Sequence, residues 1–203
     1  MKKILILISA LLLCLGCKQK AATSGGDDAF QKLSEDYLKG YLDWRPATGT
    51  GLGFHEYDGK VTDLSKASIA KELARLKDYD QKMAELDTAA LSEQAFMDYR
   101  ILRSAIKNDM FGLEETRDLF KNPMSYAGAI DVSIYVKRDF APIEERLKSI
   151  IAIEQKAPEI FADAKANLQD TMAKPHIELA IQIARGTREF MNGDLKVALK
   201  DVK

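Results

Sequence analysis

Apolar side chains recur at intervals of three or four residues along most of this 203-residue chain. That spacing places them on one face of a helix, whereas a half-buried strand requires alternation with a period of two. All five prolines fall at boundaries between the segments defined in this way. A proline is tolerated at the start of a helix and ends one that precedes it. The sequence therefore predicts an all-α fold, an irregular bundle of about six to eight helices.

The strongest helical patterns are separated by short connections that carry turn and capping residues. Ser65 and Ser92 each precede a periodic segment, as helix N-caps do. The two helices that they begin are joined by only a few residues, so we expect them to pack antiparallel as a hairpin. The expected helices cover residues 30–44, 66–86, 92–115, 143–156, 158–168 and 175–192.

Residues 124–136 differ from the other segments because they are apolar on more than one face. A helix that is apolar all round belongs in a core, so this segment is predicted to be a helix at the centre of the bundle. Residues 130–136 alternate and contain β-branched side chains, so a strand is the alternative.

The N-terminus has the parts of a secretory signal. Two lysines precede an apolar run over residues 4–15, which at about a dozen residues is too short to cross a bilayer comfortably. Gly16 and Cys17 then resemble the lipobox of bacterial lipoproteins, in which the cysteine is diacylated and becomes the mature N-terminus. We predict a lipoprotein signal peptide over residues 1–16 and lipidation at Cys17. An uncleaved anchor or an ordinary secretory signal is the alternative.

Small and polar residues follow the predicted lipidation site without any period. Residues 17–28 are therefore predicted to be the lipidated cysteine and a flexible tether, and residues 29–203 a single helical domain. The expected location is the cell envelope of a bacterium, with the chain lipid-anchored to a membrane and facing the periplasm or the exterior.

The charge of the chain is nearly balanced, with a net charge of −1 that becomes −3 when the two signal lysines are removed. There is no basic excess for nucleic acid, which is therefore excluded as a partner, and the membrane is expected to be bound through the lipid anchor. Both cysteines lie in or beside the signal, so the mature domain has no disulfide and no thiolate metal site.

The stretch Pro46–Ser65, PATGTGLGFHEYDGKVTDLS, is predicted to be an irregular connection between the first helix and the bundle. Its His55-Glu56 pair begins the zinc-peptidase motif His-Glu-x-x-His, but Gly59 stands where the second histidine is required. His176 and a glutamate two residues later do not share a helix face. No catalytic or metal-binding residue is therefore predicted in this chain.

Four neighbouring polar-capable residues in this stretch are nevertheless candidates for a binding role. Irregular segments on a rigid helical frame often line binding sites. We expect a purely structural turn here, and the alternative is that the turn faces a substrate cleft in the complete protein. The four candidate residues are His55, Glu56, Tyr57 and Asp58.

Several consecutive segments together resemble one known family. LGFHEYDGKVTDLS, SEQAFMDYRILRSAI, NPMSYAGAI, KRDFAPIEERLKSI and AKPHIELAIQIARG occur in this order between Phe30 and Asn192. They resemble the bacterial lipoprotein family catalogued as domain of unknown function 885. The resemblance implies a larger, mostly helical protein, whose later part carries a His-Glu-x-x-x-Gly-His type segment and is similar to zinc metallopeptidases of the carboxypeptidase kind.

No residue of this chain matches that metal-binding segment. The resemblance therefore implies the N-terminal helical portion of a lipid-anchored, zinc-peptidase-like protein, without catalytic activity on its own. Zinc is expected only in the missing C-terminal part of the family, and a peptide substrate only for the full-length protein. The alternatives are a self-standing lipid-anchored helical binding or scaffold protein and a short regulator that docks with a full-length paralogue.

Overall fold

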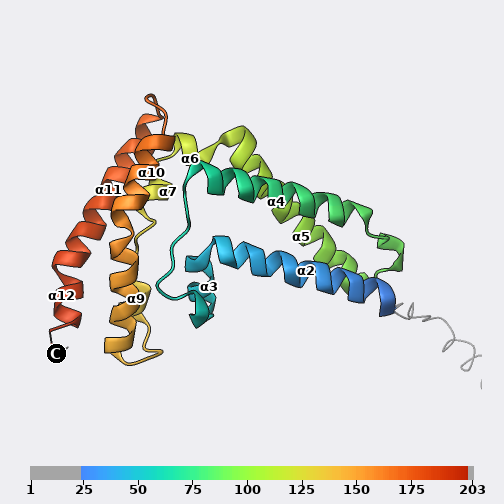
Figure 1. The fold of residues 1–203 in the computed structure, drawn as a ribbon, viewed down its shortest axis with the longest axis horizontal. Coiled ribbons are helices and arrows are strands. Elements are labelled where there is room, and N and C mark those ends of the chain that lie inside the picture. The colour runs from blue at the N-terminus through green and yellow to red at the C-terminus, as the bar shows by residue number, and fades with distance from the viewer. Residues whose placement is uncertain (1–23, 201–203) are drawn as a thin grey trace, which may run out of the picture.

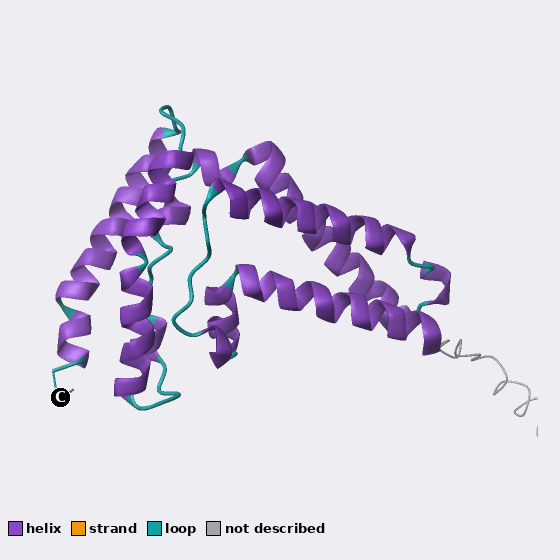
Figure 2. Cartoon of the chain, in the orientation of Figure 1, coloured by secondary structure: helices purple, strands orange, loops and turns teal. Residues whose placement is uncertain are grey.

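A computed structural model describes residues 24–200, and every regular element in this range is helical (Figures 1 and 2). The predicted all-α fold is confirmed. The predicted signal peptide and Cys17 lie outside the described residues. The α-helices are α2 (Ser24–Trp44), α3 (Pro46–Leu52), α4 (Lys66–Glu85), α5 (Glu93–Phe111), α6 (Asp118–Lys121), α7 (Met124–Ala127), α8 (Ile134–Lys137), α9 (Ile143–Gln155), α10 (Ala157–Asn167), α11 (Lys174–Asn192) and α12 (Asp194–Ala198).

The helices form two arms that meet at an angle (Figure 1). The N-terminal arm consists of the long helices α2, α4 and α5, and the C-terminal arm of the helices from α7 to α12. Each arm buries its own apolar side chains. The N-terminal core contains Phe30, Tyr37, Leu76, Met83, Leu91, Tyr99 and Ile106. The C-terminal core contains Leu64, Tyr126, Ile130, Val132, Tyr135, Ile150, Ile153, Ile160, Ala164 and Leu195.

The N-terminal arm follows from its sequence pattern and its caps. Ser65 Oγ accepts a hydrogen bond from Ser68 N, and Ser92 Oγ accepts one from Ala95 N, each at 3.2 Å. These bonds confirm both predicted N-caps, and α4 and α5 pack against each other as the expected hairpin. Helix α5 ends in a turn of π-helix at Gly112–Thr116.

Helix α2 begins earlier than the sequence pattern predicts. It starts at Ser24, so residues 24–28, which were predicted to belong to the tether, are helical. Tertiary contact explains the difference, because Asp27 Oδ1 accepts a hydrogen bond from Ser92 N at 2.8 Å. This bond joins the first turn of α2 to the first turn of α5.

The central segment 124–136 was predicted to be one helix, and this is wrong in detail. It forms two short helices, α7 and α8, separated by a turn in which Asp131 Oδ1 accepts a hydrogen bond from Ser133 N. Such an Asx turn competes with helical hydrogen bonding. The predicted burial is confirmed, since Tyr126, Val132 and Tyr135 are almost inaccessible to solvent. No strand occurs here.

The stretch Pro46–Ser65 is also more regular than predicted. Its first third forms helix α3, with Pro46 in the first turn, followed by a 3₁₀ turn at His55–Tyr57. Asp58 and Gly59 form a turn, and the part from Lys60 to Ser65 runs as a loop between the arms, up to the start of α4 (Figure 2). Among the described helices, none is both long enough and apolar enough to span a membrane.

Two isoleucines of α5 test the N-terminal core. Ile106 is fully buried, whereas 69% of Ile101 is exposed on the same helix. We expect Ile106→Ala to lower the free energy of unfolding by about 2–5 kcal/mol, because it leaves a cavity in the core. Ile101→Ala should change it by no more than about 0.5 kcal/mol. Urea denaturation of both variants measures the difference, and equal effects would contradict the assigned core.

Candidate functional site

The junction between the two arms is built around Pro46–Ser65, the stretch to which the sequence also pointed. Helix α3 turns back after α2 (Figure 1), and its Gly49 packs directly against the ring of Tyr57. A Cβ atom at position 49 would overlap that ring. Gly53 ends α3 with φ of 92°, and Gly59 has φ of 74°, a left-handed conformation that favours glycine.

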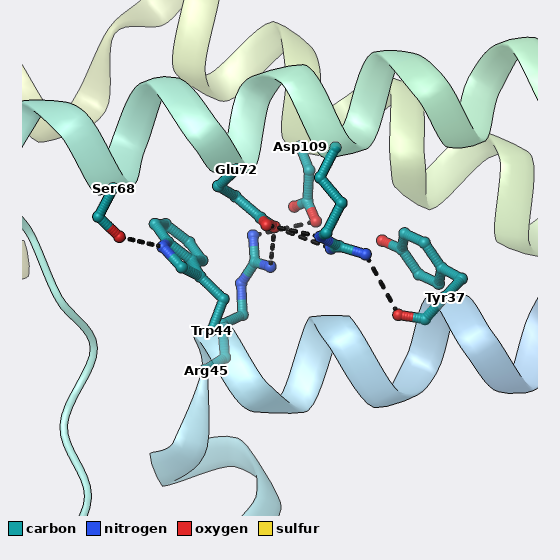
Figure 3. A network of polar contacts seen from close by, with 7 residues as sticks. Tyr37, Trp44, Arg45, Ser68, Glu72 and Asp109 are labelled. Carbon is teal, nitrogen blue, oxygen red and sulfur yellow. Dashed lines mark hydrogen bonds and ion pairs between the residues drawn. The ribbon is translucent and has the colours of Figure 1, made fainter.

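A network of charged side chains fixes the start of this stretch (Figure 3). Glu72 of α4 is 3% exposed and lies between two arginines. Arg75 donates to both of its carboxylate oxygens, at 2.7 Å and 2.9 Å, and Arg45 donates to Oε1 at 3.3 Å. Arg45 also forms an ion pair with Asp109 of α5 at 3.0 Å. Two cations thus face two anions, and the network links α4 and α5 to the end of α2.

Aromatic side chains hold Arg45 in place at this corner. Its guanidinium carbon lies 4.4 Å from the centre of the Tyr41 ring and 4.8 Å from that of Trp44. Trp44, the only tryptophan of the chain, donates through Nε1 to Ser68 Oγ at 3.1 Å. These contacts tie the last turn of α2 to the first turn of α4.

The pKa values around the network reflect its burial. Burial raises the pKa of Tyr37 to about 12, with a further contribution from the charge of Asp109. Burial also raises the pKa of Asp109, and this outweighs the opposing effect of Arg45. For Arg75, burial alone would lower the pKa, but hydrogen bonds and charge from Glu72 raise it. A raised carboxyl pKa means that Asp109 binds its proton more tightly in the folded state than in the unfolded chain. Asp109 therefore stabilises the fold at low pH, and this contribution is lost as the pH rises through its folded-state pKa.

Three polar contacts attach the remainder of the stretch to the C-terminal arm. Arg138 donates to Gly51 O at 2.7 Å, and Asn167 Nδ2 donates to Leu64 O at 2.7 Å. The backbone N–H of Gly59 donates to the hydroxyl of Tyr135 at 2.9 Å. Leu64 itself belongs to the C-terminal core. The stretch is therefore held by one arm at its start and by the other at its end.

Two of the four candidate cleft residues meet at this junction. His55 Nδ1 lies 2.9 Å from Asp58 Oδ2, and the imidazole stacks on the ring of Phe140 with centroids 4.1 Å apart. Half of the His55 side chain is exposed. Asp58 Oδ1 is buried and has no hydrogen-bond partner among the described residues. The imidazole of His55 is therefore held in a fixed orientation at the surface, where it could bind a ligand or accept a proton. Its contacts in the described part of the chain, Asp58 and Phe140, include no nucleophile.

The other two candidate residues have different surroundings. Tyr57 is buried, and its hydroxyl donates to Asp43 Oδ1 at 3.3 Å, so it packs α3 onto α2. Glu56 is exposed. The structure thus brings His55 and Asp58 into contact, whereas Tyr57 is a packing residue of the α2–α3 corner. That the four face a substrate cleft stays the alternative prediction.

A cavity of about 400 Å³ opens beside this group, between the connecting stretch and the C-terminal arm. Its volume lies within the usual range for small-ligand pockets. None of the four candidate residues lines the cavity, although Pro46–Ser65 supplies six of its lining residues. The lining residues are Ala47, Thr50, Lys60, Val61, Thr62, Leu64, Ser125, Gly128, Ala129, Asp131, Ile134, Tyr135 and Ile153.

The residues of the junction do not fit a zinc site. No group of three or more His, Cys, Asp or Glu side chains between residues 24 and 200 is arranged to hold a metal ion. The chain has two histidines, and His55 is already engaged by Asp58 and Phe140. The charged cluster around Glu72 contains two arginines, which repel a cation and satisfy the carboxylates themselves.

The fold and the junction define an all-α protein with two helical arms. The chain belongs to the family described as "Bacterial protein of unknown function (DUF885)", whose family model matches residues 46–201. The resemblance seen in the sequence is therefore confirmed. A search of curated proteins found no match.

A solved structure shares this fold. It is described as "a putative lipoprotein of unknown function from Shewanella oneidensis" and superposes with a TM-score of 0.75 at 23% sequence identity. The match covers 85% of this chain but 31% of that one, so the present chain spans about a third of the length of the Shewanella protein. At this identity the similarity concerns the fold.

Sequence reasoning missed the charged network of Arg45, Glu72, Arg75 and Asp109. One signal could have indicated it. Glu72 lies three residues after Ile69 and four before Leu76, in the apolar stripe of α4, where a charged side chain has to be paired. Arg75 lies on the same helix at a spacing of three, but Arg45 and Asp109 come from the end of α2 and from α5 and could not be read from local spacing.

The network predicts a large effect of a single substitution. Glu72→Ala leaves Arg75 and Arg45 with a half-buried, partly unpaired charge, so we expect a loss of about 3 kcal/mol in unfolding free energy. The matched control is Glu114→Ala, which removes an exposed ion pair with Lys77 and should cost at most about 1 kcal/mol. Urea midpoints give both values. A Glu72→Ala loss no larger than that of the control would refute the network's role.

Proposed function

We propose that this chain is the N-terminal helical part of a lipid-anchored, zinc-peptidase-like envelope protein and has no catalytic activity on its own. In the complete protein, the junction of the two arms forms one wall of a substrate cleft. The observation that carries the proposal is the coverage of the shared fold, since 85% of this chain matches only 31% of the Shewanella structure.

The geometry of the junction supports a binding wall more than a reaction centre. The cavity combines apolar side chains with one cation and one anion, Lys60 and Asp131. Four of its lining residues carry a hydroxyl: Thr50, Thr62, Ser125 and Tyr135. Small polar groups set in an apolar wall are typical of sites that orient a ligand. The His55–Asp58 pair lies on the same connecting stretch as this cavity. A metal and its activated water would come from a part of the protein beyond this chain.

The lipid anchor belongs to the same proposal. Cys17 is the proposed acylated residue, and the Shewanella protein of the same fold is also described as a lipoprotein. The peptide substrate, the zinc ion and the orientation in the envelope are proposals for the complete protein, and they rest on the family resemblance.

A self-standing binding or scaffold protein is the second candidate. It is favoured by the two arms, each of which buries a core of its own. In that case the cavity at the junction would bind a ligand without turnover. The two candidates differ in whether catalytic residues elsewhere in a longer protein act on the bound ligand.

An assay for zinc-dependent hydrolysis tests the proposal. We expect the purified chain to hydrolyse a mixture of short peptides no faster than the buffer does, with or without added zinc. Since its residues do not fit a zinc site, a chelator should leave its Tm unchanged. A full-length family member assayed in parallel serves as the positive control. Chelator-sensitive hydrolysis by this chain alone would contradict the proposal.

A further inference from the structure

The outer face of α5 carries an exposed apolar stripe. Met97, Ile101 and Phe111 are 47%, 69% and 55% exposed. Ser104 and Asn108, both exposed, fall between them, so the five residues follow one another in steps of four and three. Steps of this kind keep side chains on one side of a helix. The stripe therefore runs from Met97 to the end of α5, with three large apolar side chains and two small polar ones.

The opposite face of α5 is the one that packs within the N-terminal arm. Tyr99 and Ile106 lie in the N-terminal core, and Leu102 and Met110 pack against it. Helix α5 thus carries large apolar side chains on both faces, and α2 and α4 pack against only one of these faces. Single exposed apolar residues are ordinary on a protein surface, but an aligned set on one helix indicates an interaction surface.

Two basic side chains border this stripe on one side. Arg100 and Lys107 are both exposed and lie seven residues apart, adjacent to Met97, Ser104 and Phe111 in the helical pattern. The guanidinium of Arg100 reaches Met97 Sδ at 4.0 Å. Two exposed acids are also present: Glu93 lies one turn before Met97 on the same side of the helix, and Asp98 follows Met97. Apolar residues flanked by Arg and Lys are the pattern of a helix that lies in a membrane interface, where the cations contact lipid phosphates.

The position of the stripe relative to Cys17 favours the lipid bilayer as its partner. Asp27 in the first turn of α2 accepts a hydrogen bond from Ser92, the N-cap of α5, so the two helices begin side by side. The seven residue steps from Cys17 to Ser24 span at most about 25 Å when fully extended. Helix α5, with 19 residues, is itself about 28 Å long. A lipid at Cys17 therefore keeps the stripe within reach of the bilayer surface.

We propose that the outer face of α5, formed by Met97, Ile101 and Phe111 with Arg100 and Lys107, docks onto the lipid bilayer. The proposal rests on the lipid anchor of the proposed function. The balanced charge of the chain provides no general attraction to membranes, so docking depends on tethering, which turns a weak contact into an intramolecular one. Docking sets the N-terminal arm along the membrane and gives the junction a fixed orientation toward it.

A site-specific fluorescence experiment tests the docking. The complete chain is produced in a bacterial host so that Cys17 is acylated, and it is then reconstituted in vesicles of phosphatidylethanolamine and phosphatidylglycerol. Ile101→Cys and Phe111→Cys are labelled separately with an environment-sensitive nitrobenzoxadiazole dye. Leu179→Cys on α11, which is 46% exposed, is the control in the other arm. We expect a blue shift and quenching by spin-labelled lipid at positions 101 and 111 and neither at 179.

Two further variants separate docking from anchoring. Ile101→Asp should leave the Tm and co-sedimentation with vesicles unchanged but abolish lipid quenching of the dye at position 111. Cys17→Ala should abolish co-sedimentation. A chain that co-sediments without quenching at 101 and 111 overturns the docking and leaves the anchor intact. A chain that never co-sediments overturns both. A blue shift at 101 without vesicles, insensitive to quenching lipid, means that protein covers the stripe and also overturns the proposal.

Discussion

Glu72 is a carboxylate almost fully removed from water, and the arrangement of the helices around it follows from that constraint. A buried charge is tolerated only when it is paired and hydrogen-bonded. Arg75 supplies two hydrogen bonds from the same helix, and Arg45 supplies a third from the end of α2. Because Arg45 also reaches Asp109 on α5, the position of one side chain fixes where α2 ends relative to both neighbours. The sharp turn into α3 starts at this point.

The same turn begins the connection between two separate cores. The stretch Pro46–Ser65 leaves the N-terminal arm at Arg45 and enters the C-terminal core at Leu64. Between these points it contacts the far arm through Gly51, Gly59 and Leu64. The cavity and the His55–Asp58 pair lie along this path, so the candidate site is only as well ordered as the joint between the arms. This is the physical link between the charged network and any binding at the junction.

Local features of the sequence were sufficient to predict most of the fold. Apolar period, proline positions and the serine caps depend on neighbours a few residues away, and they placed α4, α5 and α9 to α11 correctly. Helix α3 escaped notice because PATGTGL has poor helix propensity, and its packing against Tyr57 is a tertiary contact that the local sequence does not reveal. The division of 124–136 likewise depends on an Asx turn at Asp131. The stretch was recognised as important, but the partners of Arg45 and the walls of the cavity come from positions far along the chain, which periodicity does not reveal.

We expect the stretch from Arg45 to Ser65 to join the two cores into one cooperative unit. Trp44 is the only tryptophan and lies at this joint, whereas far-ultraviolet circular dichroism reports on the helices of both arms. Equilibrium unfolding in urea, followed by both signals on the same samples, therefore tests the claim directly. We expect the two transitions to coincide in midpoint and slope. A Trp44 transition separated from the main loss of helix would contradict the account and show that the arms unfold independently.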